Sequence, residues 1–275
     1  MSELPKPVAS DALAPADPPA DPWAELRSLT PARIALGRSG ASLPTREVLA
    51  FGIAHAQARD AVHAALDVDA LATALQPLGL PIIRTRSAAE TRSAYLARPD
   101  WGRRLSPSSR DALEALARSD GPEVLLVIAD GLSAVAPQRH ASALISALLP
   151  QLDGLRIGPL VIATQARVAL ADEIAECFGA QLVVCLIGER PGLSSPDSLG
   201  AYITYAPKIG TTDEARICIS NIRPEGCAIG DAATLIAASL RAAFKARRSG
   251  VALREPSKAL AGDASTAAAL SDQKP

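Results

Sequence analysis

The chain has 275 residues, of which 48% are hydrophobic and 21% are charged, which is enough apolar material for one substantial core. Its 28 basic and 29 acidic residues leave a net charge of -1, so the charge does not favour a nucleic acid as partner. There is no run of 18 or more apolar residues and no secretory signal. We therefore expect a cytoplasmic globular protein that binds neither nucleic acid nor membrane.

Both ends of the chain differ from its middle. Residues 1–22 are rich in Pro, Ala and Asp without apolar periodicity, which predicts a disordered leader, and residues 255–275 predict a disordered tail. The four cysteines show no CxxC spacing, so we expect mostly buried, reduced thiols rather than a zinc site or a disulfide framework.

The first half of the body, residues 23–119, predicts a helical N-terminal region. Helix start signals and apolar periodicity place helices near residues 44–67, 68–77, 87–97 and 107–118. In the first of these, His55 and Arg59 lie four residues apart within an otherwise apolar stripe. An internal polar network and a docking face would each explain that placement.

The second half, residues 120–254, predicts a Rossmann-like, doubly wound parallel-sheet domain. Continuous apolar runs alternate with helical segments, a pattern typical of a parallel sheet covered on both faces. The expected strands are residues 124–129, 160–163, 182–187 and 201–205, and the expected helices end near 152, span 168–178 and span 232–247. In such sheets ligands bind beyond the carboxyl ends of the strands, where polar segments follow at 130–133, 164–167 and 188–190.

Two acidic residues at these strand ends are candidate site residues. Glu189, beside Arg190, opens an irregular loop over residues 188–198, a place where recognition groups are common. The alternative is that both side chains pair with neighbours and cap the loop, and the residues alone leave the two readings open. Asp130 before Gly131 could be a catalytic carboxylate, but an Asp-Gly step more often caps the following helix.

Several kinds of site lack support in the sequence. No glycine-rich phosphate loop follows a strand, which disfavours dinucleotide and nucleotide enzymes. His55, His63 and His140 have no second ligand at a metal-type spacing. Cys218 has no histidine nearby in sequence, so a buried structural thiol is the default unless a cofactor packs on it.

Several strings in this sequence resemble the ethanolamine ammonia-lyase small subunit (light chain) family. They are LTPARIALGR at 29–38, PTRE at 44–47, HAQARDAV at 55–62, IADGLSA at 128–134, GERPGL at 188–193 and CISNIRPEG at 218–226. The resemblance runs in order through roughly residues 25–252.

The resemblance implies a hetero-oligomer in which a large subunit, a TIM barrel, converts ethanolamine to acetaldehyde and ammonia by radical chemistry. Residues 23–119 would dock on that large subunit, and residues 120–254 would contact adenosylcobalamin at the interface. The family's cofactor contacts fall at Val168, Glu189 and Cys218, with no catalytic residue and no metal ligand in this chain. Relatives work alongside ethanolamine-utilisation shells, so location inside a bacterial microcompartment is a further expectation.

Two rival hypotheses belong to other classes of protein. An independent α/β enzyme using Asp130, Glu189 and Arg190 would turn over substrate alone, whereas a purely structural subunit would assemble without contacting the cofactor. The missing catalytic constellation disfavours the first rival, and only the family resemblance disfavours the second.

Overall fold

The computed structural model describes residues 23–30, 32–116 and 120–253, so the predicted leader 1–22 and tail 255–275 lie outside the described residues. The chain divides into two units, one ending at Ala50 and the other beginning at Phe51. The first unit contains helix α1 (Ala24–Ser28) and the start of helix α2 (Thr45–His63). The second unit contains the rest of α2 and the sheet.

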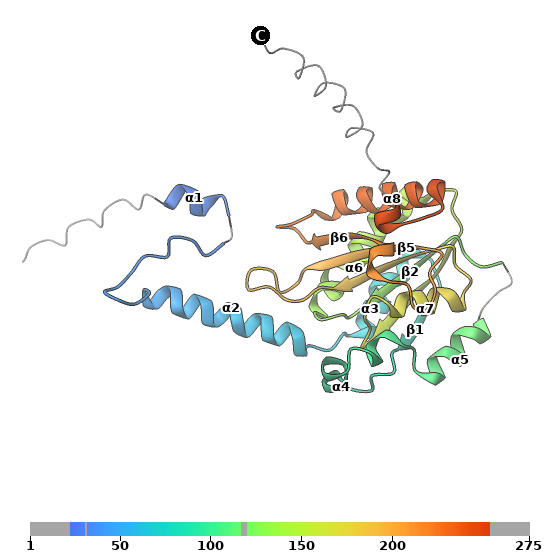
Figure 1. Ribbon diagram of the computed structural model, residues 1–275, viewed down its shortest axis with the longest axis horizontal. Helices are drawn as coiled ribbons and strands as arrows, with labels where there is room; N and C mark the ends of the chain where they lie inside the picture. Colours follow the sequence, from blue (N-terminus) through green and yellow to red (C-terminus); the bar gives the residue numbers. More distant parts are fainter. Residues whose placement is uncertain (1–22, 31, 117–119, 254–275) are drawn as a thin grey trace, which may run out of the picture. The chain divides into compact units, whose positions relative to one another are not determined.

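The second unit is built on one six-stranded mixed sheet (Figure 1). Its strands are β1 (Ile82–Arg86), β2 (Val124–Ala129), β3 (Ile157–Thr164), β4 (Leu182–Gly188), β5 (Leu199–Tyr205) and β6 (Arg216–Ile222). Their order is β1-β3-β2-β4-β5-β6. The first four strands in this order run parallel, whereas β5 and β6 are antiparallel to their neighbours.

Helices cover both faces of the sheet, as the doubly wound prediction requires. One face packs on α3 (Val68–Leu75), α6 (Val135–Leu148) and α8 (Ile229–Ala246), and the other packs on α5 (Pro107–Leu116) and α7 (Leu170–Cys177). Strand β2 feeds both cores, because Leu126 and Ile128 face one side while Leu125 and Val127 face the other. Each such fully buried side chain contributes roughly 1.5–3 kcal/mol, which explains the continuous apolar runs in the sequence.

The predicted parallel sheet is wrong at its β5–β6 side. A parallel connection needs a crossover of about a dozen residues or more, usually a helix. Residues 189–198 and 206–215 form no α-helix that could make such a crossover, so β5 and β6 each return antiparallel to the strand before them.

The region predicted to be helical also contributes a strand. β1 at one edge of the sheet pairs with β3, and short 3-10 helices at Gln76–Leu78 and Trp101–Arg103 flank it in sequence. Helix α4 (Arg92–Ala97) begins later than predicted because the Thr91 side chain accepts a hydrogen bond from Ala94 N at 3.1 Å. Helix α2 ends earlier than predicted, and Asp67 then caps α3 through Ala70 N at 2.9 Å.

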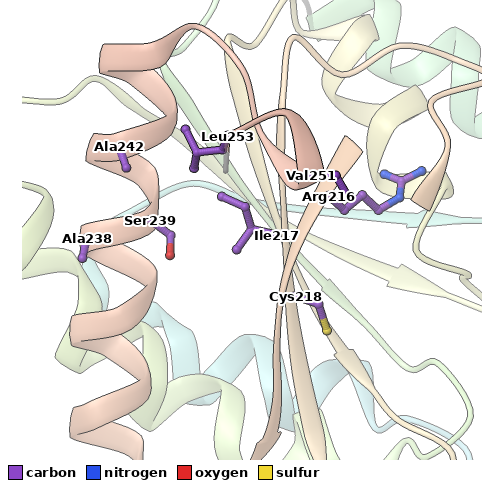
Figure 2. A pocket seen from close by; sticks show the side chains of 9 residues that line it. Arg216, Ile217, Cys218, Ala238, Ser239, Ala242, Val251 and Leu253 are labelled. Carbon is purple, nitrogen blue, oxygen red and sulfur yellow. The ribbon is translucent and has the colours of Figure 1, made fainter. Parts of the chain in front are cut away.

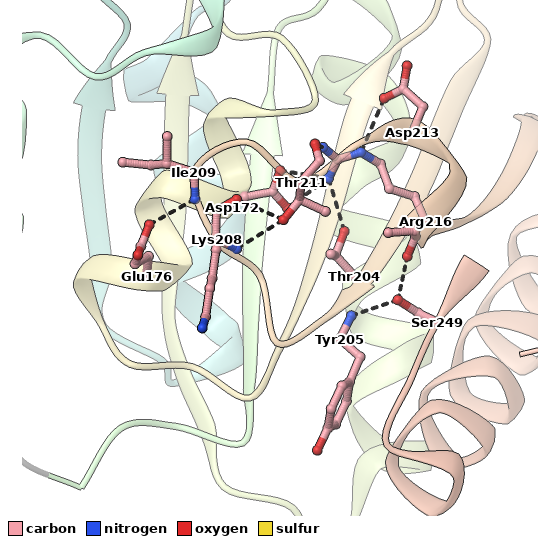
Figure 3. Close-up of polar contacts among 11 residues, drawn as sticks. Asp172, Glu176, Thr204, Tyr205, Lys208, Ile209, Thr211, Asp213, Arg216 and Ser249 are labelled. Carbon is pink, nitrogen blue, oxygen red and sulfur yellow. Dashed lines mark hydrogen bonds and ion pairs between the residues drawn. The ribbon is translucent and has the colours of Figure 1, made fainter. Parts of the chain in front are cut away.

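A buried ion pair ties α7 to the antiparallel edge of the sheet (Figure 3). Arg216 Nη1 lies 2.7 Å from the Asp172 carboxylate, and the two side chains are 2% and 1% exposed. The Arg216 guanidinium also donates to Thr204 Oγ1 at 3.1 Å and to the Thr211 carbonyl at 2.7 Å. Burial raises the pKa of Asp172 to about 6, although Arg216 acts in the opposite direction.

Candidate functional site

A pocket of about 390 Å³ lies at the carboxyl ends of the parallel strands. Val168 and Glu189, two of the three predicted contact residues, both line it. The other lining residues are Tyr95, Gly131, Leu132, Arg167, Ile187, Gly188, Arg190 and Tyr202. Because β2, β3 and β4 run parallel, the segments that follow them meet at one edge of the sheet, as the sequence predicted.

Two glycines allow the ends of β2 and β4 to meet at this pocket. Leu132 N donates to the Gly188 carbonyl at 3.0 Å. A Cβ atom on Gly188 would overlap the Ser133 carbonyl oxygen, and one on Gly131 would overlap the Gly188 carbonyl oxygen. Gly131 also has φ +57°, a left-handed conformation that residues other than glycine rarely adopt. The pocket wall therefore depends on the absence of side chains at both positions.

The Glu189 carboxylate links the pocket to the antiparallel strands. Its Oε2 accepts hydrogen bonds from Ser198 Oγ at 2.5 Å and from Asn221 N at 3.1 Å. The other oxygen, Oε1, lies over Gly200, where a Cβ atom would be 3.0 Å away. Glu189 thus pairs with its neighbours, as one of the two sequence interpretations required, and it also lines the pocket.

Asp130 has a structural role that differs from the predicted one. Its carboxylate does not cap the following helix, because α6 has no side-chain cap. Instead it accepts hydrogen bonds from Gln165 N at 2.8 Å and Ala166 N at 2.9 Å, in the segment that leads from β3 to α7. Burial raises the pKa of Asp130, and these two donors oppose that shift. Asp130 therefore holds the backbone that carries Val168.

The loop at residues 189–198 is fixed from outside the pocket. Ser133 Oγ donates to the Pro196 carbonyl at 2.7 Å. The Asp197 carboxylate lies 3.0 Å from Arg139 Nη1 and 3.2 Å from His140 Nε2. Although burial alone would raise the pKa of Asp197, hydrogen bonds from Arg139 and His140 hold it below its ordinary value. These contacts keep the loop that begins with Glu189 in one place.

Cys218, the third predicted contact residue, does not line this pocket but lies beside it. It is directly opposite Tyr202 in the β5–β6 pair, and Tyr202 lines the pocket. The thiol is exposed, so the buried structural thiol expected from the sequence is wrong. Cys218 also borders a groove of about 660 Å³ beside α8 (Figure 2), in which Ile217 points toward α8 and Cys218 points away from it.

Tyr202 and Tyr95 are pocket residues that the sequence reasoning missed. Tyr95 is fully buried, its hydroxyl donates to the Ala166 carbonyl at 3.2 Å, and burial raises its pKa to about 12. The Arg167 guanidinium lies 4.4 Å from the centre of the Tyr95 ring. Tyr202 reaches the ligand edge through the antiparallel pairing of β5 with β4, which the sequence did not predict, and nothing local in the sequence distinguishes Tyr95.

Helix α2 exposes His55 and Arg59, which does not fit the internal polar network that was one of the two interpretations. Both side chains are exposed, and the His55 ring stacks on Phe51 with centroids 6.3 Å apart. Val48, Leu49, Phe51 and Ile53 on the same helix are 48–62% exposed. Several large apolar side chains close together on one exposed helix are typical of a protein interface.

Charged side chains and backbone polar groups surround the pocket. Carboxylate, guanidinium and backbone polar groups converge there, but the lining residues include no histidine and no nucleophile paired with a base. Among the described residues, no group of three or more His, Cys, Asp or Glu side chains could hold a metal ion. Within the same residues, no helix has the length and apolarity needed to cross a membrane.

The structure defines an α/β protein with a six-stranded mixed sheet and a pocket at the carboxyl ends of its parallel strands. A family model described as ethanolamine ammonia-lyase light chain (EutC) matches residues 20–254. The chain belongs to this family.

Named relatives agree with the family match. The ethanolamine ammonia-lyase small subunit of Azotobacter vinelandii is 53% identical over 239 residues, covering 86% of this chain and 88% of the relative. The protein of the same name from Xanthomonas campestris pv. campestris strain B100 is 51% identical, covering 88% and 90%. A third, from Pseudomonas syringae pv. tomato, is 50% identical, covering 93% and 91%.

Proposed function

We propose that this chain is the small subunit of an adenosylcobalamin-dependent ethanolamine ammonia-lyase and contacts the cofactor at its interface with the large subunit. The observation that carries the proposal is the pocket at the carboxyl edge of the sheet, where Val168 and Glu189 lie together. Cys218 joins them through its cross-strand neighbour Tyr202. The full enzyme would be a cytoplasmic hetero-oligomer, and we expect it to work alongside a bacterial microcompartment.

The pocket fits one edge of a corrin ring better than a whole cofactor. Its volume of about 390 Å³ suits part of a large ligand, so the remainder would lie against the partner. The corrin edge carries amide groups that both donate and accept hydrogen bonds. Glu189 supplies an acceptor, Arg167 and Arg190 supply donors, and Val168 gives apolar contact.

This chain's residues would bind and orient the cofactor rather than react with it. When bound, adenosylcobalamin supplies a homolysing cobalt–carbon bond that starts the radical chemistry. Glu189 and the backbone at Gly131 and Gly188 would hold the corrin's edge, and Tyr202 lines the pocket opposite Cys218 in the β5–β6 pair.

Glu189→Ala is expected to weaken binding of adenosylcobalamin by the two-subunit complex by about 1–3 kcal/mol, or roughly 5- to 150-fold. The reason is that the substitution removes the Glu189 carboxylate, which would accept hydrogen bonds from the corrin amides. The affinity would be measured by titrating the purified complex and following the cofactor's absorbance.

Ser198→Ala is the matched control for this experiment. It removes the 2.5 Å hydrogen bond to Glu189 but leaves the carboxylate and its bond from Asn221 N in place. Both variants lose the hydrogen bond between Ser198 and Glu189, so if this bond acts only by holding the loop in place, both should weaken cofactor binding. Equal cofactor affinity for Glu189→Ala, Ser198→Ala and the wild type would contradict the assigned role.

Leu49→Glu on α2 is expected to weaken association with the large subunit by at least about tenfold, because a charge replaces an apolar contact at the interface. Leu49 is 62% exposed, so the substitution should leave the fold intact. Biolayer interferometry against the immobilised large subunit would measure the effect. Leu235→Glu on α8, at a leucine that is 49% exposed, is the matched control. Equal affinities for the two variants would show that α2 is not the docking helix.

The independent-enzyme hypothesis receives no support from the geometry of its three residues. Asp130 is buried and engaged with Gln165 N and Ala166 N, and Glu189 is engaged with Ser198 and Asn221. Arg190 lines the pocket. Turnover of ethanolamine by this chain without a partner would nevertheless restore that hypothesis.

A further inference from the structure

Arg92 connects the end of helix α2 to the strand ends that form the pocket. Its Nε donates to the Val62 carbonyl at 2.7 Å, and its Nη1 donates to the Gly131 carbonyl at 2.8 Å. Val62 lies in the last turn of α2, where carbonyls have no partner within the helix and a cation complements the helix dipole. One planar guanidinium thus holds two backbone groups that are distant in sequence.

The connection continues from Gly131 to the residues that carry Val168. Arg92 Nη1 also lies 3.6 Å from the Asp130 carboxylate, and these side chains are 14% and 4% exposed. Asp130 in turn accepts the hydrogen bonds from Gln165 N and Ala166 N. Two residues later the chain reaches Val168 in the pocket. The path from α2 to the pocket therefore consists of the part-buried hydrogen bonds of Arg92, its ion pair with Asp130, and the hydrogen bonds that Asp130 accepts.

Tyr95 contacts both Arg92 and Arg167 and also bonds to Ala166. The Arg92 guanidinium lies 4.7 Å from its ring centre and the Arg167 guanidinium lies 4.4 Å from it. The Tyr95 hydroxyl donates to the Ala166 carbonyl, and Arg167 Nη2 donates to the Tyr95 carbonyl at 3.3 Å. Displacement of Arg92 would therefore shift Arg167 and Val168 together.

We propose that Arg92 is a positioning residue that couples docking of α2 on a partner to the shape of the cofactor pocket. This inference rests on the proposed function, because it requires both the partner and the cofactor. A partner that fixes α2 would fix the Val62 carbonyl, and through Arg92 it would fix the strand ends at Gly131 and Asp130. By linkage, the cofactor would then tighten partner binding by the same factor as the partner tightens cofactor binding.

The test compares partner affinity with and without cofactor. The dissociation constant of the full-length chain for the large subunit is measured in the absence and in the presence of saturating adenosylcobalamin, without ethanolamine, and the ratio is the linkage factor. We expect Arg92→Met to lower this factor at least about fivefold. Arg92→Lys keeps the charge but cannot hold both carbonyls in one planar fork, so it should lower the factor too. If Arg92→Met does not fold, the linkage factor of Arg92→Lys decides the question.

Arg241→Met is the matched control. Arg241, on α8, likewise donates a hydrogen bond to a carbonyl distant in sequence, that of Gln151. It does not line the pocket and is not bonded to α2 in this way. A merely structural role for Arg92 would weaken both affinities and leave their ratio unchanged. A linkage factor within twofold of the wild type in the Arg92 variants would therefore overturn the proposal. If the wild type binds no large subunit or no cofactor, the proposed function itself fails, and that result is distinct from a lost linkage.

Discussion

Replacing Arg216 with methionine is expected to lower the free energy of unfolding by about 3–5 kcal/mol, because Asp172 would remain buried without its partner. Asp172 is 1% exposed, and Arg216 Nη1 at 2.7 Å is its nearest charge (Figure 3). Thr204 and the Thr211 carbonyl would also lose their donor. Urea unfolding of the full chain, followed by circular dichroism, would measure the loss.

The double variant Arg216→Met with Asp172→Leu is expected to recover most of that stability. Burial raises the pKa of Asp172 to about 6 even though Arg216 is adjacent, so the cost of burying the charge exceeds the attraction between the pair. Arg156→Met, which breaks an exposed pair with Glu123 at 3.7 Å, is the control and should cost less than about 1 kcal/mol. A single Arg216→Met variant as stable as Arg156→Met would contradict the assigned role of the buried pair.

Gly131→Ala is expected to lower the free energy of unfolding by about 2–5 kcal/mol. About 1–2 kcal/mol comes from placing a non-glycine residue in the left-handed conformation, since Gly131 has φ +57°. A further 1–3 kcal/mol, roughly, comes from overlap of the new Cβ with the Gly188 carbonyl oxygen, a backbone atom that cannot move aside easily. The same substitution should weaken cofactor binding, because these two residues form a wall of the pocket.

Gly154→Ala separates the two contributions in this experiment. Gly154 is exposed and has φ +83°, but no atom lies within 4 Å of the position of its Cβ. It should therefore show the conformational cost alone, about 1–2 kcal/mol, with unchanged cofactor affinity. If the two alanine variants were equally stable, the close approach of Gly131 to Gly188 would not constrain the fold.

The sequence predicted the central strands because burial on both faces imposes a continuous apolar run. β2 and β4 match residues 124–129 and 182–187 closely for this reason. β1 and β6 lie at the two edges of the sheet, and their runs IIRTR and RICISNI mix apolar with polar residues. Edge strands need no continuous apolar run, so the sequence gives them a weaker signal.

The candidate site was predictable only where strand direction alone determines it. Val168 and Glu189, which the family resemblance supplied, follow β3 and β4, the strands on either side of β2. Because these strands run parallel, the two residues meet at one edge of the sheet. The position of Cys218 beside Tyr202 depends on the antiparallel register of β5 and β6, which the apolar pattern does not specify. The link from Arg92 to Val62 and Gly131 spans 30 and 39 residues, so no local pattern could indicate it.

We propose that this chain acts as the cofactor-contacting small subunit of a two-subunit enzyme. The most direct test is to co-express it with an ethanolamine ammonia-lyase large subunit, purify the complex through a tag on this chain, and measure acetaldehyde formed from ethanolamine. We expect activity only when both subunits and adenosylcobalamin are present. Failure of the two chains to co-purify, or acetaldehyde formation by this chain alone, would contradict the account.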